Sequence, residues 1–279
     1  METPAETAER LKHASSFGAV AAAYADHRPS YADEAIRWSL APLSATALDL
    51  PGPPAAAPRV VDLGAGTGIL TAALSRLGAD VTAVEPDPEM LAELRRRVAG
   101  AHAAAGCAEA LPLPDASVDA VLAGQAMHWF DLDRALPEIA RVLRPGGVLA
   151  GLWNVDDDRI GWVAELTEMC RRKGSNTLLR WRNGAASPRP EQIQQASAGL
   201  FGPVETAEFP NSQLRTADSL VASIATHSNL LIMDITERQA LLAQVSGFLR
   251  ERRETSGGEF RLPLLTIVSR LRRLPLPPA

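Results

Sequence analysis

The chain has 279 residues, enough for one large α/β domain or for a domain with a helical cap. Its hydrophobic content of 46% and charged content of 22% are those of a globular protein and exclude a disordered chain. The formal net charge of -5 provides no basic field, so we expect no nucleic-acid partner.

Cysteines, histidines and apolar runs limit the other classes of function. Cys107 and Cys170 lack the spacing of a metal motif and the five histidines form no ligand pattern, so no metal is expected. Free thiols are typical of the cytoplasm, which is the expected location. No apolar run reaches the length of a membrane span and no signal-peptide pattern is present, so no membrane association is expected. The sequence leaves the oligomeric state open.

The first segment has the spacing of a helix. Apolar residues recur at helical intervals between Leu11 and Tyr24, and Pro29 ends the pattern. Residues 51–58 are rich in proline and predict a stiff connector. We therefore expect residues 1–50 to form an N-terminal helical cap segment.

Residues 60–68 carry most of the functional information. Two valines lead into Asp62, and glycines follow in alternation at Gly64, Gly66 and Gly68 before an amphipathic stretch. This order predicts a buried strand, a tight turn and a helix whose N-terminal amides face the carboxyl end of the strand. Glycine suits such a turn because its dihedral angles disfavour side chains and because a ligand must approach bare backbone.

A second strand, residues 80–84, ends at Glu85, seventeen residues after Gly68. A carboxylate at this place can accept hydrogen bonds from both hydroxyls of a ribose. The G-x-G-x-G spacing differs from the usual G-x-G-x-x-G of dinucleotide folds. Asp62 also suits an ammonium group better than a pyrophosphate, because a carboxylate repels phosphates.

Strand and helix patterns alternate over the following residues. Asp87 and Pro88 are typical of the cap and first residue of a helix, which ends near Gly100. This alternation predicts a doubly wound, mostly parallel sheet with helices on both faces and ligands at the carboxyl ends of its strands. The elements expected after Gly100 are a strand at 102–107, a strand at 118–123, a helix through Leu136 to Leu143, and a strand at 148–153 that follows the Arg144-Pro145-Gly146-Gly147 turn. Residues 51–155 are therefore the expected cofactor-binding core.

Beyond Trp153 the pattern changes. A helix opening at 156–158, a polar stretch and a short helix predict a helical insertion over residues 156–200, a candidate lid or substrate wall. Residues 201–279 are expected to complete the sheet. Their pattern is a strand at 204–209, two helices and a returning strand at 260–268, which would give seven strands with an antiparallel final pair.

The order of these motifs resembles a known family. Residues 60–67, 84–87, 106–112, 117–125 and 144–147 follow one another as in class I S-adenosylmethionine-dependent methyltransferases of the small-molecule branch. The resemblance covers about residues 10–155 and implies a Rossmann-like methyltransferase fold with S-adenosyl-L-methionine as cofactor and S-adenosyl-L-homocysteine as product. Features similar to trans-aconitate-type and ubiquinone-biosynthesis-like methyltransferases are Phe17, Tyr24, Arg28-Pro29, Tyr31 and the run from Gln125 to Asp131.

The resemblance also implies roles for individual residues. Asp62 would lie near the ammonium group of the cofactor, and Glu85 would hold the ribose hydroxyls. Cys107 stands where relatives often have an aspartate, so adenine contact there would fall to the backbone or be weaker. The other implied cofactor contacts are Gly64, Ala65, Gly66 and Thr67 around the methionine part, Pro86 against the adenine, Ala108 and Glu109 at the adenine edge, Gln125 beside the sulfonium, and Tyr24 and Arg28 from the N-terminal helix.

Residues for the methyl acceptor are less specific. In-line methyl transfer needs a base only if the acceptor arrives protonated. His128 is the candidate because its ordinary pKa is near neutrality and it follows the fourth strand, but it could instead pack the pocket wall with Trp129. Trp129 and Trp153 are candidate substrate contacts at strand ends, although aromatic residues in such places are often core.

Two other functions stay open beside the leading hypothesis of a methyltransferase for a small carboxylate, hydroxyl or amine. An NAD(P)-dependent oxidoreductase could use Glu85 for a ribose, but the third glycine is misplaced for a pyrophosphate and no Tyr-x-x-x-Lys pair is present. A protein that binds S-adenosylmethionine without methyl transfer also fits, because the motifs describe the cofactor half alone.

Overall fold

The computed structural model describes residues 28–47, 57–172, 190–225, 230 and 233–275. The predicted N-terminal helix with Tyr24 and most of the proline-rich connector lie outside these residues. Contacts divide the chain into two units: a core unit of residues 30–153, 187–209 and 266–279, and a helical unit of residues 1–29, 154–186 and 210–265. The four segments expected from the sequence, residues 1–50, 51–155, 156–200 and 201–279, stay a prediction of domain organisation.

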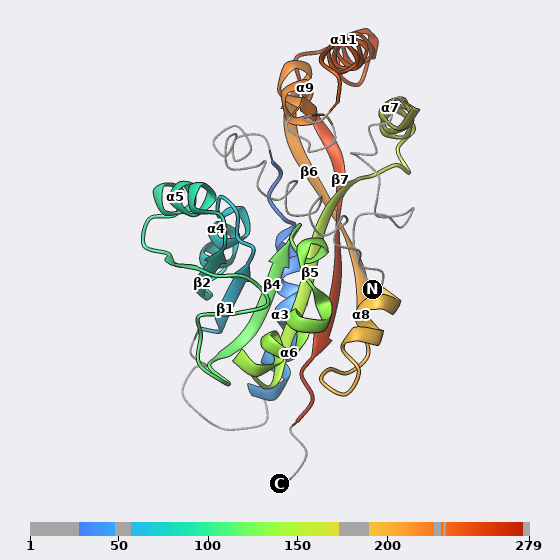
Figure 1. The fold of residues 1–279 in the computed structure, drawn as a ribbon. Coiled ribbons are helices and arrows are strands. Elements are labelled where there is room, and N and C mark those ends of the chain that lie inside the picture. Colours follow the sequence, from blue (N-terminus) through green and yellow to red (C-terminus); the bar gives the residue numbers. More distant parts are fainter. Residues whose placement is uncertain (1–27, 48–56, 173–189, 226–229, 231–232, 276–279) are drawn as a thin grey trace. The chain divides into compact units, whose positions relative to one another are not determined.

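Seven strands form one sheet, which confirms the predicted α/β class (Figure 1). Their order is β3-β2-β1-β4-β5-β7-β6, and the ladders from β3 to β5 are all parallel. The winding reverses between β1 and β4, so the carboxyl ends of these two strands form the switch point at which ligands bind in such sheets. The strands are β1 (Arg59–Leu63), β2 (Asp80–Glu85), β3 (His102–Ala105), β4 (Val118–Gly124), β5 (Leu143–Asp156), β6 (Glu205–Thr216) and β7 (Glu259–Arg272).

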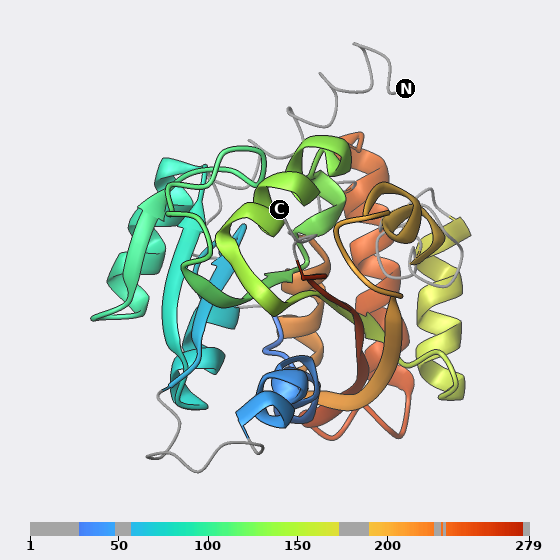
Figure 2. The same cartoon turned by 90° about the horizontal axis from the view of Figure 1, so that it is seen from below.

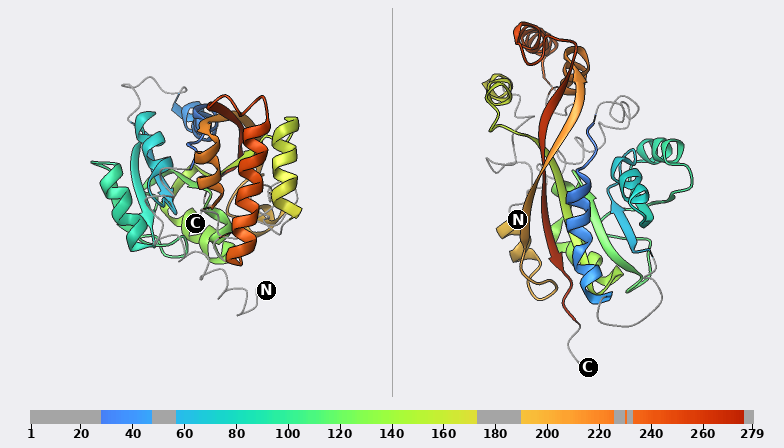
Figure 3. Two further views of the ribbon diagram at one scale, coloured as in Figure 1. Left: turned by 90° about the horizontal axis from the view of Figure 1, so that it is seen from above. Right: turned by 180° about the vertical axis from the view of Figure 1, so that it is seen from behind.

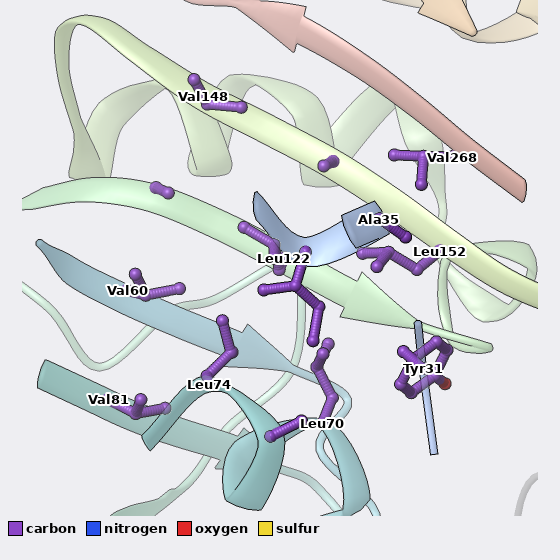
Figure 4. Packing of buried hydrophobic residues seen from close by; sticks show 14 residues of the cluster. Tyr31, Ala35, Val60, Leu70, Leu74, Val81, Leu122, Val148, Leu152 and Val268 are labelled. Atoms are coloured by element: carbon purple, nitrogen blue, oxygen red, sulfur yellow. The ribbon is translucent and has the colours of Figure 1, made fainter. Parts of the chain in front are cut away.

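Helices cover both faces of the sheet in the core unit, as expected for a doubly wound fold. Helices α3 (Asp33–Ala47) and α4 (Ile69–Arg76) bury apolar side chains against one face (Figure 4). Figure 2 shows α6 (Leu132–Val142) on the side opposite α3, and the right view of Figure 3 shows α3 in front of the strands. The other helices of this unit are α5 (Pro88–Arg97), the 3-10 turn η2 (Met127–Trp129) and α8 (Pro190–Ala196).

Helix α5 begins where the sequence predicts. The Asp87 carboxylate accepts hydrogen bonds from the amides of Glu89 at 2.8 Å and Met90 at 3.0 Å, and Pro88 is the first helical residue. The cap satisfies amides that have no partner within the helix, and a proline there loses no hydrogen bond. The predicted cap and start are therefore confirmed.

The Arg144-Pro145-Gly146-Gly147 segment is not the turn that the sequence predicts before a strand at 148. Strand β5 already begins at Leu143, opposite Val118, and its ladder resumes with Val148 opposite Ala120. The four residues form a bulge in one continuous strand, which Gly146 permits with its φ of 79°. The bulge is held from outside the ladder, because the Gly146 amide donates to the Arg273 carbonyl and the Arg273 amide donates to Gly147.

Strand β6 is longer than predicted. The predicted strand covers residues 204–209, whereas β6 runs from Glu205 to Thr216 and contains Pro210. It lies at the edge of the sheet, where a missing N–H need not cost a ladder hydrogen bond. The prediction was wrong because an edge position cannot be known before the strand order is known.

The helical unit contains α7 (Gly161–Arg172), α9 (Ala217–Ala225) and α11 (Ile235–Glu251). Helix α11 contacts both α9 and α7, and the left view of Figure 3 shows the three side by side. Their shared core is apolar and includes Val163, Leu166, Leu220, Ile224, Leu241, Val245 and Leu249. None of the helices in the described ranges has both the length and the apolar character needed to cross a bilayer.

Replacing Gly151 with alanine is expected to destabilise the protein by about 1–3 kcal/mol through overpacking. An alanine Cβ at this position of β5 would lie 2.3 Å from Cη2 of Trp153, whose ring is buried. Urea denaturation would measure the effect. Gly247→Ala in α11 is the control, since its Cβ would meet nothing within 4 Å, and alanine favours a helix by roughly 1 kcal/mol over glycine. Wild-type stability in Gly151→Ala would contradict the packing described here.

Candidate functional site

The turn between β1 and α4 has the left-handed backbone that its glycines predict. Gly64, Gly66 and Gly68 have φ values of 68°, 56° and 88°. A Cβ on Gly64 would lie 2.6 Å from the Cβ of Ala126, and one on Gly68 would lie 2.9 Å from Leu94. A Cβ on Gly66 would meet nothing within 4 Å. Packing therefore requires two of the glycines, while Gly66 presents bare backbone to open space.

Asp62 lies two residues before Gly64 and is a buried acid with one unsatisfied oxygen. Asp62 is only 1% exposed, and its Oδ2 accepts a hydrogen bond from Thr71 Oγ1 at 2.6 Å. Oδ1 is buried and has no hydrogen-bond partner among the described residues. Burial raises the pKa of Asp62 to about 7, and the charge of Glu85 adds to the shift. A cationic donor would satisfy this oxygen and offset the cost of its charge.

Glu85 ends β2 and is fixed by two backbone amides. Oε2 accepts from the Gly66 amide at 2.8 Å, and Oε1 accepts from the Asp87 amide at 2.9 Å. Burial raises the pKa of Glu85, while these two hydrogen bonds act in the opposite direction. Each carboxylate oxygen retains a further lone pair with which to accept a hydroxyl. The structure thus brings the predicted acid of β2 directly onto the predicted glycine turn.

The carboxyl end of β4 is also tightly built. Gln125 follows the strand with a φ of 54°, which is strained for a residue with a side chain, and its amide donates to the Leu152 carbonyl at 2.8 Å. A Cβ on Gly124 would lie 2.5 Å from the hydroxyl oxygen of Tyr31, a residue only 7% exposed. Figure 4 shows the Tyr31 side chain at the end of β4. Tyr31 therefore packs so closely on Gly124 that no side chain fits there, although the two residues are far apart in the sequence.

The residues expected around the adenine lie in three different environments. Pro86 is exposed, so its ring is available for packing against a ligand. Ala108 is buried at 2% exposure, and Glu109 uses Oε1 to accept from the Asp131 amide at 2.9 Å. Cys107 is half-buried, and its carbonyl accepts from the Ala110 amide at 3.2 Å. The cofactor roles of these residues stay predictions.

The candidate residues for catalysis and substrate are close in sequence but differ in burial. His128 and Trp129 lie on η2, half-buried, with ring centroids 4.6 Å apart. Trp153 is 2% exposed and packs over Gly151. The base role of His128 and the substrate roles of the two tryptophans are not tested by these positions and stay predictions.

Two residues with polar contacts in the structure were not identified from the sequence. Thr71, which binds Asp62, is a lone hydroxyl on the apolar face of α4, and that was the signal available. Arg215 is 5% exposed in the helical unit and carries no local motif. Burial and the charge of Arg28 lower the pKa of Arg215 to about 10. The predicted cofactor contact of Arg28 stays untested, and Tyr24 lies outside the described residues.

Other candidate sites in the described ranges are few. No group of three or more histidine, cysteine, aspartate or glutamate side chains there could hold a metal ion. A hollow of about 750 Å³ opens at the amino ends of β1 and β2, where Arg59, Asp80, Asp119 and Arg144 line it. It lies at the opposite ends of these strands from the Gly64–Thr67 turn and Glu85.

Comparison with known proteins identifies the family. Residues 61–151 match the family model of a methyltransferase domain. An uncharacterized methyltransferase of Mycobacterium tuberculosis is 41% identical over 243 residues, which are 87% of this chain and 89% of the relative. The malonyl-[acyl-carrier protein] O-methyltransferase of Enterobacter lignolyticus is 40% identical over 133 residues, 47% of this chain and 52% of that protein.

A solved structure shares the fold. A candidate type II methyltransferase from Anaeromyxobacter dehalogenans superposes with a TM-score of 0.60 at 24% identity, over 90% of this chain and 99% of that one. Its likeness supports the Rossmann-like architecture described above. With a curated methyltransferase matched over most of both chains, and with the glycine turn and its two acids in place, the chain belongs to the class I S-adenosylmethionine-dependent methyltransferase family.

Proposed function

We propose that the chain binds S-adenosyl-L-methionine in the core unit and transfers its methyl group to a small organic acceptor. The observation that carries this proposal is the unsatisfied Oδ1 of Asp62, a buried carboxylate oxygen two residues before a glycine turn with open space at Gly66. The charge of Glu85 adds to the cost of ionising the buried Asp62, so the site favours a cation and disfavours a pyrophosphate.

The chain's own residues divide the work of binding. Asp62 would accept hydrogen bonds from the ammonium group, and Glu85 would accept them from the ribose hydroxyls. The backbone of residues 64–67 would contact the methionine part, and Pro86, Ala108 and Glu109 would surround the adenine. Gln125, held in its strained conformation at the end of β4, would face the sulfonium.

The cofactor, when bound, supplies a methyl group on a sulfonium, which already is a good leaving group. The protein then has to align the acceptor and exclude water, and such alignment can contribute roughly 7–11 kcal/mol. His128 would remove a proton only from a hydroxyl or amine acceptor, whereas a carboxylate needs no base. The partial match to a protein named as an O-methyltransferase favours an oxygen acceptor.

Calorimetric titration with S-adenosylhomocysteine and with NADH tests the proposal. We expect heat from S-adenosylhomocysteine and none from NADH; the reverse result would overturn it. A panel of carboxylic acids, alcohols and amines with radiolabelled methyl donor then tests transfer. Donor binding without turnover of any acceptor would favour the non-transferring alternative.

Donor affinity is expected to rise with pH. The pKa of Asp62 is raised to about 7 in the free protein, and a bound cation favours its ionised form, so binding releases a proton. From this titration alone, the affinity for S-adenosylhomocysteine should increase roughly eightfold from pH 6 to pH 7.5. Calorimetry at both pH values measures this, and Asp62→Asn should show a flat profile if it binds at all. A fall in affinity over this range would contradict the assignment.

A further inference from the structure

The loop that follows β3 lies beside Glu85. The Gly106 amide donates a hydrogen bond to the Glu85 carbonyl at 3.4 Å, and β3 is the neighbour of β2 in the sheet. In the proposed binding mode, Asp62 near the end of β1 holds the ammonium group and Glu85 at the end of β2 holds the ribose. The base that the ribose carries is then expected farther along the same edge, at the loop after β3.

This loop is compact but belongs to no regular element. A Cβ on Gly106 would lie 2.8 Å from Cδ of Pro112, and Cys107 pairs with Ala110 in an isolated antiparallel bridge. None of the helices and strands in the described ranges includes residues 106–113. Contacts from a neighbouring element therefore have to fix the position of the loop.

Helix α6 binds both polar groups of the Leu111 backbone. Glu138 Oε1 accepts a hydrogen bond from the Leu111 amide at 2.8 Å, and Arg141 Nη2 donates one to the Leu111 carbonyl at 3.2 Å. Arg141 Nη1 also donates to the Leu113 carbonyl at 2.9 Å. Leu111 is only 5% exposed, so its backbone has little access to water. The two side chains satisfy groups that would pair with a neighbouring strand if the loop were part of the sheet.

Glu138 and Arg141 hold each other in the geometry that this contact needs. They lie one turn apart on α6, where Arg141 Nε donates to Glu138 Oε2 at 2.8 Å and Arg141 Nη2 donates to Glu138 Oε1 at 2.7 Å. The hydrogen bond from Arg141 lowers the pKa of Glu138, which keeps the carboxylate ionised. A lysine in place of Arg141 would keep the charge but lose the planar fork that reaches several acceptors at once.

We propose that Glu138 and Arg141 are positioning residues, which hold the loop of residues 106–113 in place for the adenine of the methyl donor. This role rests on the proposed function, and it acts through the backbone of the loop. Cys107 is a poor acceptor, so recognition of the adenine amino group depends on backbone N–H and C=O groups. The directions of those groups are set by how firmly the loop is held.

The role predicts a specific selectivity. Adenine presents an amino donor beside a ring-nitrogen acceptor, whereas hypoxanthine presents an oxo acceptor beside an N–H donor. A loop held in one conformation rejects hypoxanthine, because the wrong base leaves buried polar groups unpaired. A loop that has lost its support can rearrange around either base and distinguishes them less.

Calorimetric titration of the full chain with S-adenosylhomocysteine and with its hypoxanthine counterpart, S-inosylhomocysteine, tests the role. We expect the wild type to bind the adenine ligand at least about tenfold more tightly. Arg141→Lys and Arg141→Ala should weaken S-adenosylhomocysteine by about tenfold and leave the hypoxanthine ligand nearly unchanged, so the ratio of the two affinities falls. Glu138→Gln should lower the ratio less, because its side-chain oxygen can still accept from the Leu111 amide.

Arg144→Gln is the matched control. Arg144 Nη1 pairs with Asp119 Oδ1 at 2.7 Å, and Arg144 lines the hollow at the amino ends of the strands. Its replacement removes an arginine from an ion pair of the same unit and should leave both affinities unchanged. Urea denaturation measures the stability of every variant. If Arg141→Ala fails to fold, Arg141→Lys and Glu138→Gln still provide the test.

The outcomes separate this role from a merely structural one and from the proposed function. A loss of stability with an unchanged affinity ratio in the Arg141 variants overturns the positioning role. It is also overturned if the wild type shows no preference for the adenine ligand, or if Arg144→Gln lowers the ratio as far. These results leave donor binding intact. Absence of heat from both ligands in the wild type refutes the donor site itself, and the positioning role with it.

Discussion

Asp62→Asn is expected to lower the affinity for S-adenosylhomocysteine by about 100-fold or more while the fold is retained. Removing one partner of a buried, hydrogen-bonded charge pair typically costs about 2–5 kcal/mol, and about 2.7 kcal/mol corresponds to 100-fold. The asparagine oxygen can keep the 2.6 Å hydrogen bond from Thr71, which leaves its NH₂ group where Oδ1 now is. A donor would then face the ammonium group of the ligand. Calorimetric titration measures the loss.

Stability separates this effect from misfolding. The pKa of Asp62 in the folded protein is about 7, above its ordinary value near 4, so the stability associated with this group is fully present at low pH and is lost as the pH rises through about 7. At pH 8 the asparagine variant should therefore be at least as stable as the wild type in urea denaturation. Asp33→Asn is the matched control. Asp33 on α3 forms an exposed ion pair with Arg76 of α4, and its replacement should leave the affinity unchanged. Wild-type affinity in Asp62→Asn would refute the role of this carboxylate.

Local patterns in the sequence predict the elements near the site well. The strands β1, β2 and β4, and the start of α5, appear where alternation, apolar runs and the Asp87 cap place them. The errors have a common physical origin. The continuation of β6 past Pro210 depends on that strand being at the sheet edge, and the bulge after Leu143 depends on pairing with residues near the end of β7. Both are properties of long-range contacts that no short window contains.

The same distinction holds for the candidate site. Asp62, Gly66 and Glu85 are visible as motif positions, but the hydrogen bond from the Gly66 amide to Glu85 joins residues 19 apart and requires the register of β1 with β2. The sequence placed Arg28 in a motif and gave Arg215 no role at all. The hydrogen bonds that join Asn154 to Pro29 and Asn211 to Asn154 likewise connect residues 125 and 57 positions apart, which no local pattern contains.

Gly66→Ala is expected to remove donor binding with only a small loss of stability. Its φ of 56° is left-handed, which costs an alanine roughly 1–2 kcal/mol, and its Cβ would meet no protein atom within 4 Å. The backbone amide that donates to Glu85 is retained. The added methyl group would instead occupy the open space in which the ligand must approach the turn, so we expect the affinity for S-adenosylhomocysteine to fall by about 100-fold, as measured by calorimetry.

Gly78→Ala provides the matched control, because Gly78 has a φ of 89° and equally open surroundings at the far end of α4. The two variants share the backbone penalty, so urea denaturation should show similar losses of stability in both. They differ in the position of the added methyl group relative to the switch point of the sheet, and only Gly66→Ala should lose donor binding. Equal donor affinity in the two variants would mean that the space beside Gly66 is not where the cofactor lies. Equal loss in both would mean that strain in the turns bounding α4, and not contact with the ligand, controls binding.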